Sequence, residues 1–251
     1  MPFDGKRVLV TGGSGDIGGR VARSIAGQGA RVTVLDRQPP PDTSCAFQPC
    51  DLSTSEGLDQ VVEWAGRSEW DILVNVAGIQ HFGTVESQSA DHLNRTVSVN
   101  LVAPIRLVQA VLPAMRTKRA GQIVNIGSVF GSINFAHFAT YSASKAGLRG
   151  FSQALRREVA GDGVDVTYIA PRAVRTPFND AQVMAFAKMT RMSMDDPSRV
   201  AQRIVAAIAA RRRELYIGFP EALYVRINAL VPSLIDRALA VSDRQVAKLF
   251  G

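Results

Sequence analysis

The chain has 251 residues, of which 46% are hydrophobic and 20% charged, and this composition allows a large buried core. No linker, composition break or repeat divides it, so we expect one domain over residues 1–251. The net charge is +7, but the sequence has no run of five like charges, so we expect a solvated basic surface. The alternative is that the positive charge attracts an anionic cofactor or an acyl-thioester substrate. No motif supports nucleic-acid binding.

The N-terminal segment and the cysteines predict neither secretion nor a membrane anchor. The N-terminus contains one short apolar run, which is typical of a strand and not of a signal peptide. We expect no apolar stretch to reach the roughly 18 residues that span a bilayer. Cys45 and Cys50 form neither a disulfide framework nor a metal-binding motif. We therefore expect a cytoplasmic protein without a bound metal.

Short apolar runs alternate along the chain with longer segments of helical periodicity. The runs that predict strands are residues 6–11, 30–36, 46–51, 71–78, 121–128, 164–171 and 214–219. The segments that predict helices are residues 17–28, 57–66, 89–116, 141–161 and 197–211. Pro104 lies inside the third of these helices and predicts a bend or an early turn there.

The predicted strands are nearly continuous apolar runs, which is typical of a parallel sheet buried on both faces. With the intervening helices they predict a Rossmann-like, doubly wound α/β fold, with a parallel sheet of about seven strands and helices on both faces. Such a fold binds its ligands at the carboxyl ends of the strands. The residues that directly follow each strand are therefore the candidates for function.

A C-terminal helical extension is predicted over residues 222–251, after the last strand. Its apolar residues form one helical stripe, which Pro232 interrupts: Leu223, Ile227, Leu230, Leu234 and Ala238. We favour a lid or a helix docked on its own chain or on a partner. Because Arg226 and Arg237 flank the stripe, a basic helix at a membrane interface is a second possibility. A disordered tail is the third.

A glycine run, TGGSGDIG over residues 11–18, joins the first predicted strand to the first helix. Backbone N–H groups at the start of a helix can bind a pyrophosphate, and this strand–glycine–helix context is the one that a dinucleotide site requires. The second strand ends in Asp36, whose carboxylate can accept hydrogen bonds from ribose hydroxyls and repel a 2′-phosphate. Asp36 therefore favours NAD over NADP, although Arg37 beside it could pair with a 2′-phosphate or stack on the adenine.

The glycine run forms a set with motifs that follow later strands. They are Thr11-Gly12 with Gly18, Asp51-Leu52, Asn75-Val76-Ala77-Gly78, and Ser128 with Tyr141 and Lys145. With these motifs, residues 5 to about 220 resemble the short-chain dehydrogenase/reductase family, in its single-domain branch of roughly 250 residues. In the family's register the glycine motif begins at Gly12 and ends at Gly18. Asp16 replaces the middle glycine and Val76 replaces a second asparagine.

The resemblance, with the glycine loop and the end of the second strand, assigns the cofactor-binding residues. They are Gly12, Ser14, Gly15, Asp16, Ile17, Gly18, Asp36, Arg37, Asp51, Leu52, Asn75, Ala77, Gly78, Tyr141, Lys145, Pro171, Val174 and Thr176. The family implies that Asp51 meets the adenine edge, that residues 75–78 line the ribose side and that Thr176 lies near the nicotinamide carboxamide. We expect the Asp16 side chain to turn onto the helix end and cap its free N–H groups.

Tyr141 and Lys145 are one helical turn apart and share a face. Hydride exchange with a carbonyl needs a proton at the oxygen, and a phenol of pKa ~10 is a poor base at neutral pH. A nearby ammonium would lower that pKa, so we expect Lys145 to activate Tyr141. Ser128 can hold the substrate oxygen. The resemblance adds that Asn100 joins Lys145 through water as a proton relay and that Lys145 binds the nicotinamide ribose.

The residues expected to line the substrate space are mostly apolar or aromatic. They are Gln80, His81, Phe130, Phe138 and Phe178. Such a lining suits a hydrophobic ketone or alcohol, including a 3-oxoacyl thioester, better than a sugar. Arg172 replaces a glycine of the family and is expected to be a surface arginine; the alternative places it near the cofactor diphosphate or the substrate mouth.

These observations predict an NAD-dependent enzyme that interconverts a secondary alcohol and a ketone. The alternative is an NAD-sensing binding protein that kept the fold and lost catalysis, although the intact set of Ser128, Tyr141 and Lys145 with Asn100 argues against it. The resemblance also implies that helices 89–116 and 141–161 pair across subunits in a homodimer or a homotetramer.

Overall fold

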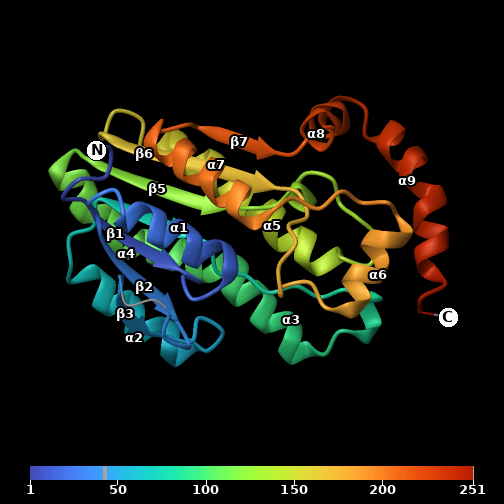
Figure 1. Ribbon diagram of the computed structural model, residues 1–251, viewed down its shortest axis with the longest axis horizontal. Coiled ribbons are helices and arrows are strands. Elements are labelled where there is room, and N and C mark those ends of the chain that lie inside the picture. The colour runs from blue at the N-terminus through green and yellow to red at the C-terminus, as the bar shows by residue number, and fades with distance from the viewer. Residues whose placement is uncertain (42–43, 251) are drawn as a thin grey trace.

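The computed structural model describes residues 1–41 and 44–250. Within them, one sheet contains seven parallel strands in the order β3-β2-β1-β4-β5-β6-β7, so the predicted doubly wound α/β fold is confirmed (Figure 1). The strands are β1 Arg7–Thr11, β2 Arg31–Asp36, β3 Ala46–Pro49, β4 Ile72–Asn75, β5 Gly121–Ile126, β6 Val164–Pro171 and β7 Glu214–Ile217. Several end earlier than predicted: β5 stops at Ile126, which leaves Ser128 in the loop beyond the strand.

The helices lie on both faces of this sheet (Figure 1). They are α1 Asp16–Ala26, α2 Ser55–Gly66, α3 Ala90–Val97, α4 Ala103–Lys118, α5 Ala139–Glu158, α6 Ala181–Met189, α7 Pro197–Ala209, α8 Glu221–Leu230 and α9 Pro232–Ala247. Helix α6 was not predicted from the sequence. Its sequence, AQVMAFAKM, is apolar almost throughout, so it offers little of the polar contrast on which helical periodicity depends.

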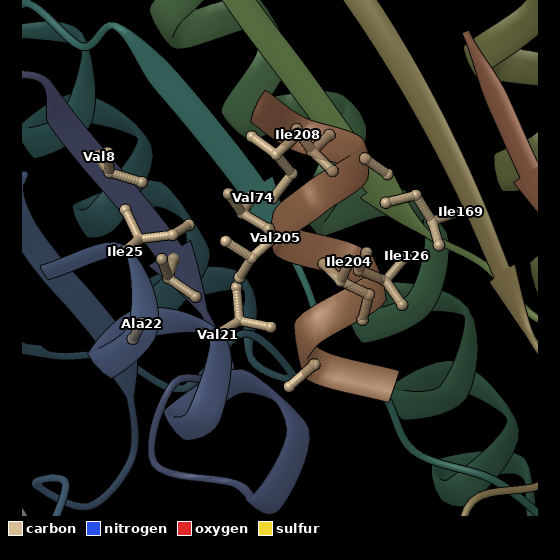
Figure 2. Packing of buried hydrophobic residues seen from close by; sticks show 14 of the residues in the cluster. Val8, Val21, Ala22, Ile25, Val74, Ile126, Ile169, Ile204, Val205 and Ile208 are labelled. Atoms are coloured by element: carbon tan, nitrogen blue, oxygen red, sulfur yellow. The ribbon is translucent and has the colours of Figure 1, made fainter. Parts of the chain in front are cut away.

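Successive strand residues supply two separate cores, because neighbouring side chains in a strand point to opposite faces. Val8 belongs to the core under α1 and α7, where Val21 and Ile204 of these helices converge on the sheet (Figure 2). Leu9, the next residue, belongs to the opposite core, which α2, α4 and α5 cover. Both faces are therefore buried, as the apolar strands predicted.

The predicted helix 89–116 is one helical run with an irregular middle. A π-helical segment, η2 Ser98–Val102, lies between α3 and α4, and Pro104 is the second residue of α4. Proline has no N–H to donate to the carbonyl four residues earlier, so the helix widens immediately before it. The expected irregularity at Pro104 is thus present, as a wide turn that contains Asn100.

The run Ala90–Lys118 is long and apolar enough to span a membrane by length and composition, contrary to our expectation. However, its apolar side chains Leu107, Val111 and Met115 are buried against the sheet in the core shared with α2 and α5. We therefore interpret this run as a core helix.

The C-terminal extension forms α8 and α9, beyond the carboxyl ends of the strands (Figure 1). It is docked on its own chain and is helical, so a disordered tail is the wrong alternative for residues 221–250; Gly251 lies outside the described residues. The predicted stripe is also wrong: Leu223, Leu230 and Leu234 are exposed.

The buried residues of the extension are Val225, Ile235 and Val246. The reason is the non-helical backbone at Val231, between α8 and Pro232, which interrupts the helical phase. A single stripe cannot continue across such a break.

The packing of α7 gives a test of the fold. Replacing Ile204 by Ala should lower the free energy of unfolding by about 2–5 kcal/mol, because the side chain is fully buried between α1, α7 and the sheet. Urea unfolding followed by circular dichroism measures the change. Leu234→Ala, at an exposed position of α9, should shift it by less than about 0.5 kcal/mol. Equal losses in both variants would contradict this assignment of the core.

Candidate active site

A cavity of about 610 Å³ lies where the strands end, and the loops after β1, β2, β4, β5 and β6 line it. The sheet order reverses between β1 and β4, which is the switch point where such folds bind ligands. Most of the predicted site residues line it: Gly12, Ser14, Gly15, Asp16, Ile17, Gly18, Asp36, Arg37, Asp51, Leu52, Ala77, Gly78, Gln80, Ser128, Phe130, Phe138, Tyr141, Lys145, Pro171, Val174, Thr176 and Phe178. The structure thus brings both predicted halves of the site into one space.

The glycine loop is held by two close approaches. Gly12 has a φ of +67°, and a Cβ there would lie 2.7 Å from the Cα atom of Ala77. A Cβ on Gly18 would lie 2.2 Å from the carbonyl oxygen of Gly12. Neither position can accept a side chain without a shift of the backbone. Gly13 is also closely packed, since a Cβ there would lie 2.6 Å from Cγ1 of Val34, so all three glycines shape the loop.

The start of α1 suits an anion. Its N-cap residue is Gly15, and no side chain of the described residues caps this end of the helix. The first N–H groups of a helix need partners, and together with the helix dipole they favour negative charge. Since Gly15, Ile17 and Gly18 line the cavity, a cofactor pyrophosphate fits at this helix end.

Asp16 does not cap the helix, so our expectation for this side chain is wrong. Its Oδ1 atom accepts a hydrogen bond of 2.7 Å from Nε of Arg20, one turn along α1. The same guanidinium donates to Oγ of Ser198 on α7 at 2.9 Å. A charge-assisted pair outcompetes the weaker bonds to backbone N–H groups. The positive charge of Arg20 also offsets the carboxylate beside the anion position.

At the other end of the nucleotide half, two carboxylates are fixed by hydrogen bonds. The Asp36 carboxylate accepts from the backbone N–H groups of Ser14 at 3.0 Å and Arg37 at 2.7 Å. Oδ1 of Asp51 accepts from the hydroxyl and the N–H of Ser53, at 2.6 and 2.9 Å. The hydroxyl bond is the main cause that lowers the pKa of Asp51, so this group is a carboxylate at neutral pH.

Arg95 lines the same end of the cavity and was missed by the sequence analysis. Its positive charge helps to lower the pKa of Asp51. No motif signals this arginine, because it comes from α3 and meets Asp51 only through the fold.

Asn75 does not line the cavity. It is buried at the end of β4, and its Nδ2 atom donates to Oδ1 of Asn125 on β5 at 2.9 Å. Asn125 in turn donates to Oγ of Ser152 on α5 at 2.9 Å. This chain of polar contacts joins two strands to a helix, so Asn75 has a structural position behind the site.

Ser128, Tyr141 and Lys145 converge at the centre of the cavity. Ser128 caps a short 3-10 turn, η3 Val129–Gly131, and lies within hydrogen-bonding reach of the Tyr141 hydroxyl. Tyr141 and Lys145 stand one turn apart on α5, with 8% and 4% of their surfaces exposed. The Lys145 ammonium donates to the Ile126 carbonyl at 3.1 Å and lies 5.9 Å from the centre of the Tyr141 ring.

Burial sets the protonation of this pair. It raises the pKa of Tyr141 to about 12, against the opposing effect of the hydrogen bond with Ser128. It also lowers the pKa of Lys145 to about 8. The expected lowering of the Tyr141 pKa by Lys145 is therefore not met in the free protein. The ammonium lies over the ring, and the cost of burying a phenolate is larger than its attraction.

Asn100 lies behind this cluster, within the π-helical segment. Its side-chain amide is held by the backbone of Ile79, with Oδ1 accepting at 2.9 Å and Nδ2 donating at 2.8 Å. Gly78 separates it from Lys145: a Cβ on Gly78 would lie 3.3 Å from Oδ1 of Asn100 and 3.5 Å from the Lys145 ammonium. Asn100 thus does not line the cavity, but only a small gap separates it from Lys145.

The predicted substrate residues divide into two groups. Phe130, Phe138, Phe178 and Gln80 line the cavity, and Nε2 of Gln80 donates to the Phe178 carbonyl at 2.8 Å. His81 does not line it: its ring packs edge-on against His92, near Ser87 and the Thr84 carbonyl. A histidine that follows a strand can point either way, and here the turn at 84–87 binds it.

One wall of the cavity was not predicted from the sequence. It consists of Val183, Phe186 and Ala187 of α6, with Met192 and Met194 after that helix. These residues went unrecognised because α6 itself was not predicted, and no motif marks them. The wall adds to the apolar character of the substrate end.

Arg172 is not the surface arginine that was expected, because only 16% of its side chain is exposed. Its guanidinium forms ion pairs with Asp195 at 2.7 Å and with Glu221 at 3.0 Å, and it also donates to the Phe219 carbonyl at 3.0 Å. Its side chain lines the cavity, but its charge is committed to these partners. Arg172 therefore joins the loop after β6 to the start of the C-terminal extension.

Known proteins resemble this chain in sequence and in structure. The family model described as short chain dehydrogenase matches residues 6–185. The 3-oxoacyl-(acyl-carrier-protein) reductase FabG of Salmonella typhimurium is 36% identical over 192 residues, which are 72% of this chain and 78% of that protein. FabG of Vibrio harveyi is 30% identical over 242 residues, which are 90% of this chain and 94% of that protein.

A solved structure of a short-chain dehydrogenase from Streptomyces avermitilis has a TM-score of 0.79 to this chain at 25% identity. The likeness covers 96% of this chain and 99% of that one. The seven-stranded fold agrees with this likeness. The chain belongs to the short-chain dehydrogenase family.

Proposed function

We propose that the protein is an NAD-dependent oxidoreductase that interconverts a ketone and a secondary alcohol, with a hydrophobic or 3-oxoacyl substrate. The observation that carries this proposal is the buried set of Ser128, Tyr141 and Lys145, which lies in one cavity with the glycine loop. A nucleotide-sensing protein would not need a phenol and an ammonium buried at the substrate end. The alternative of a catalytically silent NAD sensor is therefore less favoured.

In the direction of reduction, Tyr141 acts as the acid. Its raised pKa keeps it a neutral phenol at physiological pH, so it can give its proton to the carbonyl oxygen. The Ser128 hydroxyl holds the same oxygen by a hydrogen bond. A bound nicotinamide cofactor supplies the hydride for the carbonyl carbon.

The proton that Tyr141 loses must be replaced. Lys145 lies beside it on α5, and Asn100 is across the small gap next to Gly78. One water molecule in that gap would connect the ammonium with the Asn100 side chain. We propose that Lys145 and Asn100 relay the proton in this way, and that Lys145 also binds the nicotinamide ribose.

The preference for NAD rests on Asp36. Its carboxylate lies in the cavity at the end of β2, where it would accept hydrogen bonds from the adenosine ribose and repel a 2′-phosphate. Arg37 and Arg95 also line this end and would attract a phosphate. We propose that the carboxylate decides, because it is anchored to the Ser14 N–H next to the glycine loop.

The substrate class rests on the lining. Phe130, Phe138 and Phe178 face the cavity together with the apolar residues of α6. An apolar surface of this kind favours a hydrophobic group beside the ketone. The names of the FabG relatives, 3-oxoacyl reductases, agree with an acyl chain in this place.

Tyr141→Phe tests the acid. Removal of the hydroxyl should lower kcat for ketone reduction by about 10²–10⁴-fold, which is the usual contribution of a positioned acid or base. The affinity for NADH, measured by fluorescence titration, should change by less than roughly threefold, because the aromatic ring and its packing remain. Turnover close to that of the wild type would show that another group supplies the proton.

Asp36→Asn tests the cofactor. The amide oxygen can still accept from Ser14, but the negative charge is lost, so the ratio of kcat/KM for NADH over NADPH should fall by about tenfold or more. Parallel assays with the two cofactors measure this ratio. Glu63→Gln, an exposed carboxylate on α2, serves as the control and should leave the ratio unchanged. A wild type that prefers NADPH would contradict the choice of NAD.

The pH profile tests the protonation states. Reduction should be nearly constant from about pH 6 to 7.5 and fall above about pH 8, where Lys145 loses its charge. Oxidation should rise with pH across the whole range, because it needs the phenolate and the pKa of Tyr141 is about 12. Initial rates in both directions, with circular dichroism to verify folding at each pH, give the profile. An oxidation rate independent of pH would contradict the assignment of Tyr141 as the base.

A further inference from the structure

The segment 129–138 separates Ser128 from Tyr141 and has two sides. On one side, Phe130 and Phe138 face the cavity. On the other side, the segment packs against the C-terminal extension. The wall that a substrate would touch is therefore supported from behind by residues 221–250.

The first part of this support comes from α8 and the start of α9. Val225 and Ile235 form a buried cluster with Val129 and Ile133. Nδ2 of Asn228 donates to the Ser132 carbonyl at 2.8 Å. These contacts fix the beginning of the segment immediately after Ser128.

The second part comes from the end of the chain. Val246 is buried in the aromatic cluster that contains Phe138 and Phe186. The Phe250 ring lies 4.6 Å from the His137 ring and 5.1 Å from that of Phe82, measured between ring centres.

Phe82 lies between Phe250 and the rings that line the cavity. Its ring centre lies 4.8 Å from that of Phe138 and 5.3 Å from that of Phe186. Phe138 and Phe186 line the cavity, whereas Phe250 does not. Phe250 is thus the outer layer of a wall whose inner layer faces the substrate.

The extension also reaches the segment that carries α6. Arg172 and Asp195 stand at the two ends of that segment and pair with each other, and Glu221 at the start of α8 pairs with the same guanidinium. At the far end, α9 packs beside α6 (Figure 1). Two sides of the substrate space, segment 129–138 and α6, are therefore in contact with the extension.

We propose that Phe250 and Val246 are positioning residues that hold Phe138 and Phe186 against the apolar group of the substrate. This inference rests on the proposed ketone reduction. The ligand class is a ketone with a bulky apolar substituent, which needs a rigid aromatic surface. A small ketone reaches only Tyr141 and Ser128, whereas the ring contacts of Phe250 are with Phe82 and His137.

Phe250→Ala tests this proposal. Loss of the ring leaves Phe82 and His137 without their outer partner, so Phe138 and Phe186 can move. KM for a ketone with a long acyl chain should rise at least fivefold, while kcat for a small ketone and the affinity for NADH should stay within twofold. The ratio of kcat/KM for the long over the short substrate should fall accordingly. Amide hydrogen exchange in residues 129–138 and in α6 should become faster.

Two variants serve as controls. Leu249→Ala removes the neighbouring side chain, which is 40% exposed, and should change neither the substrate ratio nor the exchange. Phe250→Tyr keeps the ring and should retain the selectivity of the wild type. If Phe250→Ala does not fold, Phe250→Leu reports on the loss of the ring alone.

The outcomes separate the two proposals. Suppose that the wild type reduces no ketone, but Phe250→Ala speeds amide hydrogen exchange in residues 129–138 and α6. The proposed ketone reduction is then wrong, and so is the role of Phe250 in substrate specificity. The contact by which Phe250 supports the cavity wall is still confirmed. If the wild type is active and Phe250→Ala leaves both the substrate ratio and the exchange unchanged, the inference is overturned and the proposed function is untouched.

Discussion

The parallel pairing of β1 with β2 and with β4 is the constraint on which the site depends. The carboxyl ends of parallel strands lie at the same end of the sheet, so the loops that follow the strands lie together there. Here this places the glycine loop, Asp36, Gly78 and Ser128 around one cavity, although they are far apart in the chain. The packing of both faces keeps the strands in this order, because each strand supplies alternate side chains to two cores.

Much of the fold could be predicted from the sequence, because a strand buried on both faces is a continuous apolar run. Helix α6 could not, since its apolar residues have no polar side to give a period. The packing of the extension could not either: the break at Val231 changes the phase between α8 and α9, and a stripe drawn through it selects exposed residues.

The site could be predicted where its residues lie in short motifs, as for Tyr141 and Lys145 on one helix face. The ion pairs and pKa shifts of the site could not be predicted. The partner of Asp16 is a neighbour on the helix, but the partners of Arg172 are Asp195 and Glu221, which only the fold brings close. Likewise, the raised pKa of Tyr141 follows from burial, which spacing along a helix does not reveal.

The wide turn before Pro104 makes the position of Asn100 sensitive to the deletion of a single residue. A π-helical turn holds one residue more than an α-helical turn, and η2 is where Asn100 faces Ile79. Each residue of an α-helix advances the side-chain direction by about 100°. Deleting one residue here would restore a regular helix and leave the core face of α4 in place, yet it would rotate the preceding turns and carry Asn100 away from Lys145. Among related chains, the deletion of one residue in this π-helical segment would therefore mark proteins in which the amide no longer lies near the lysine.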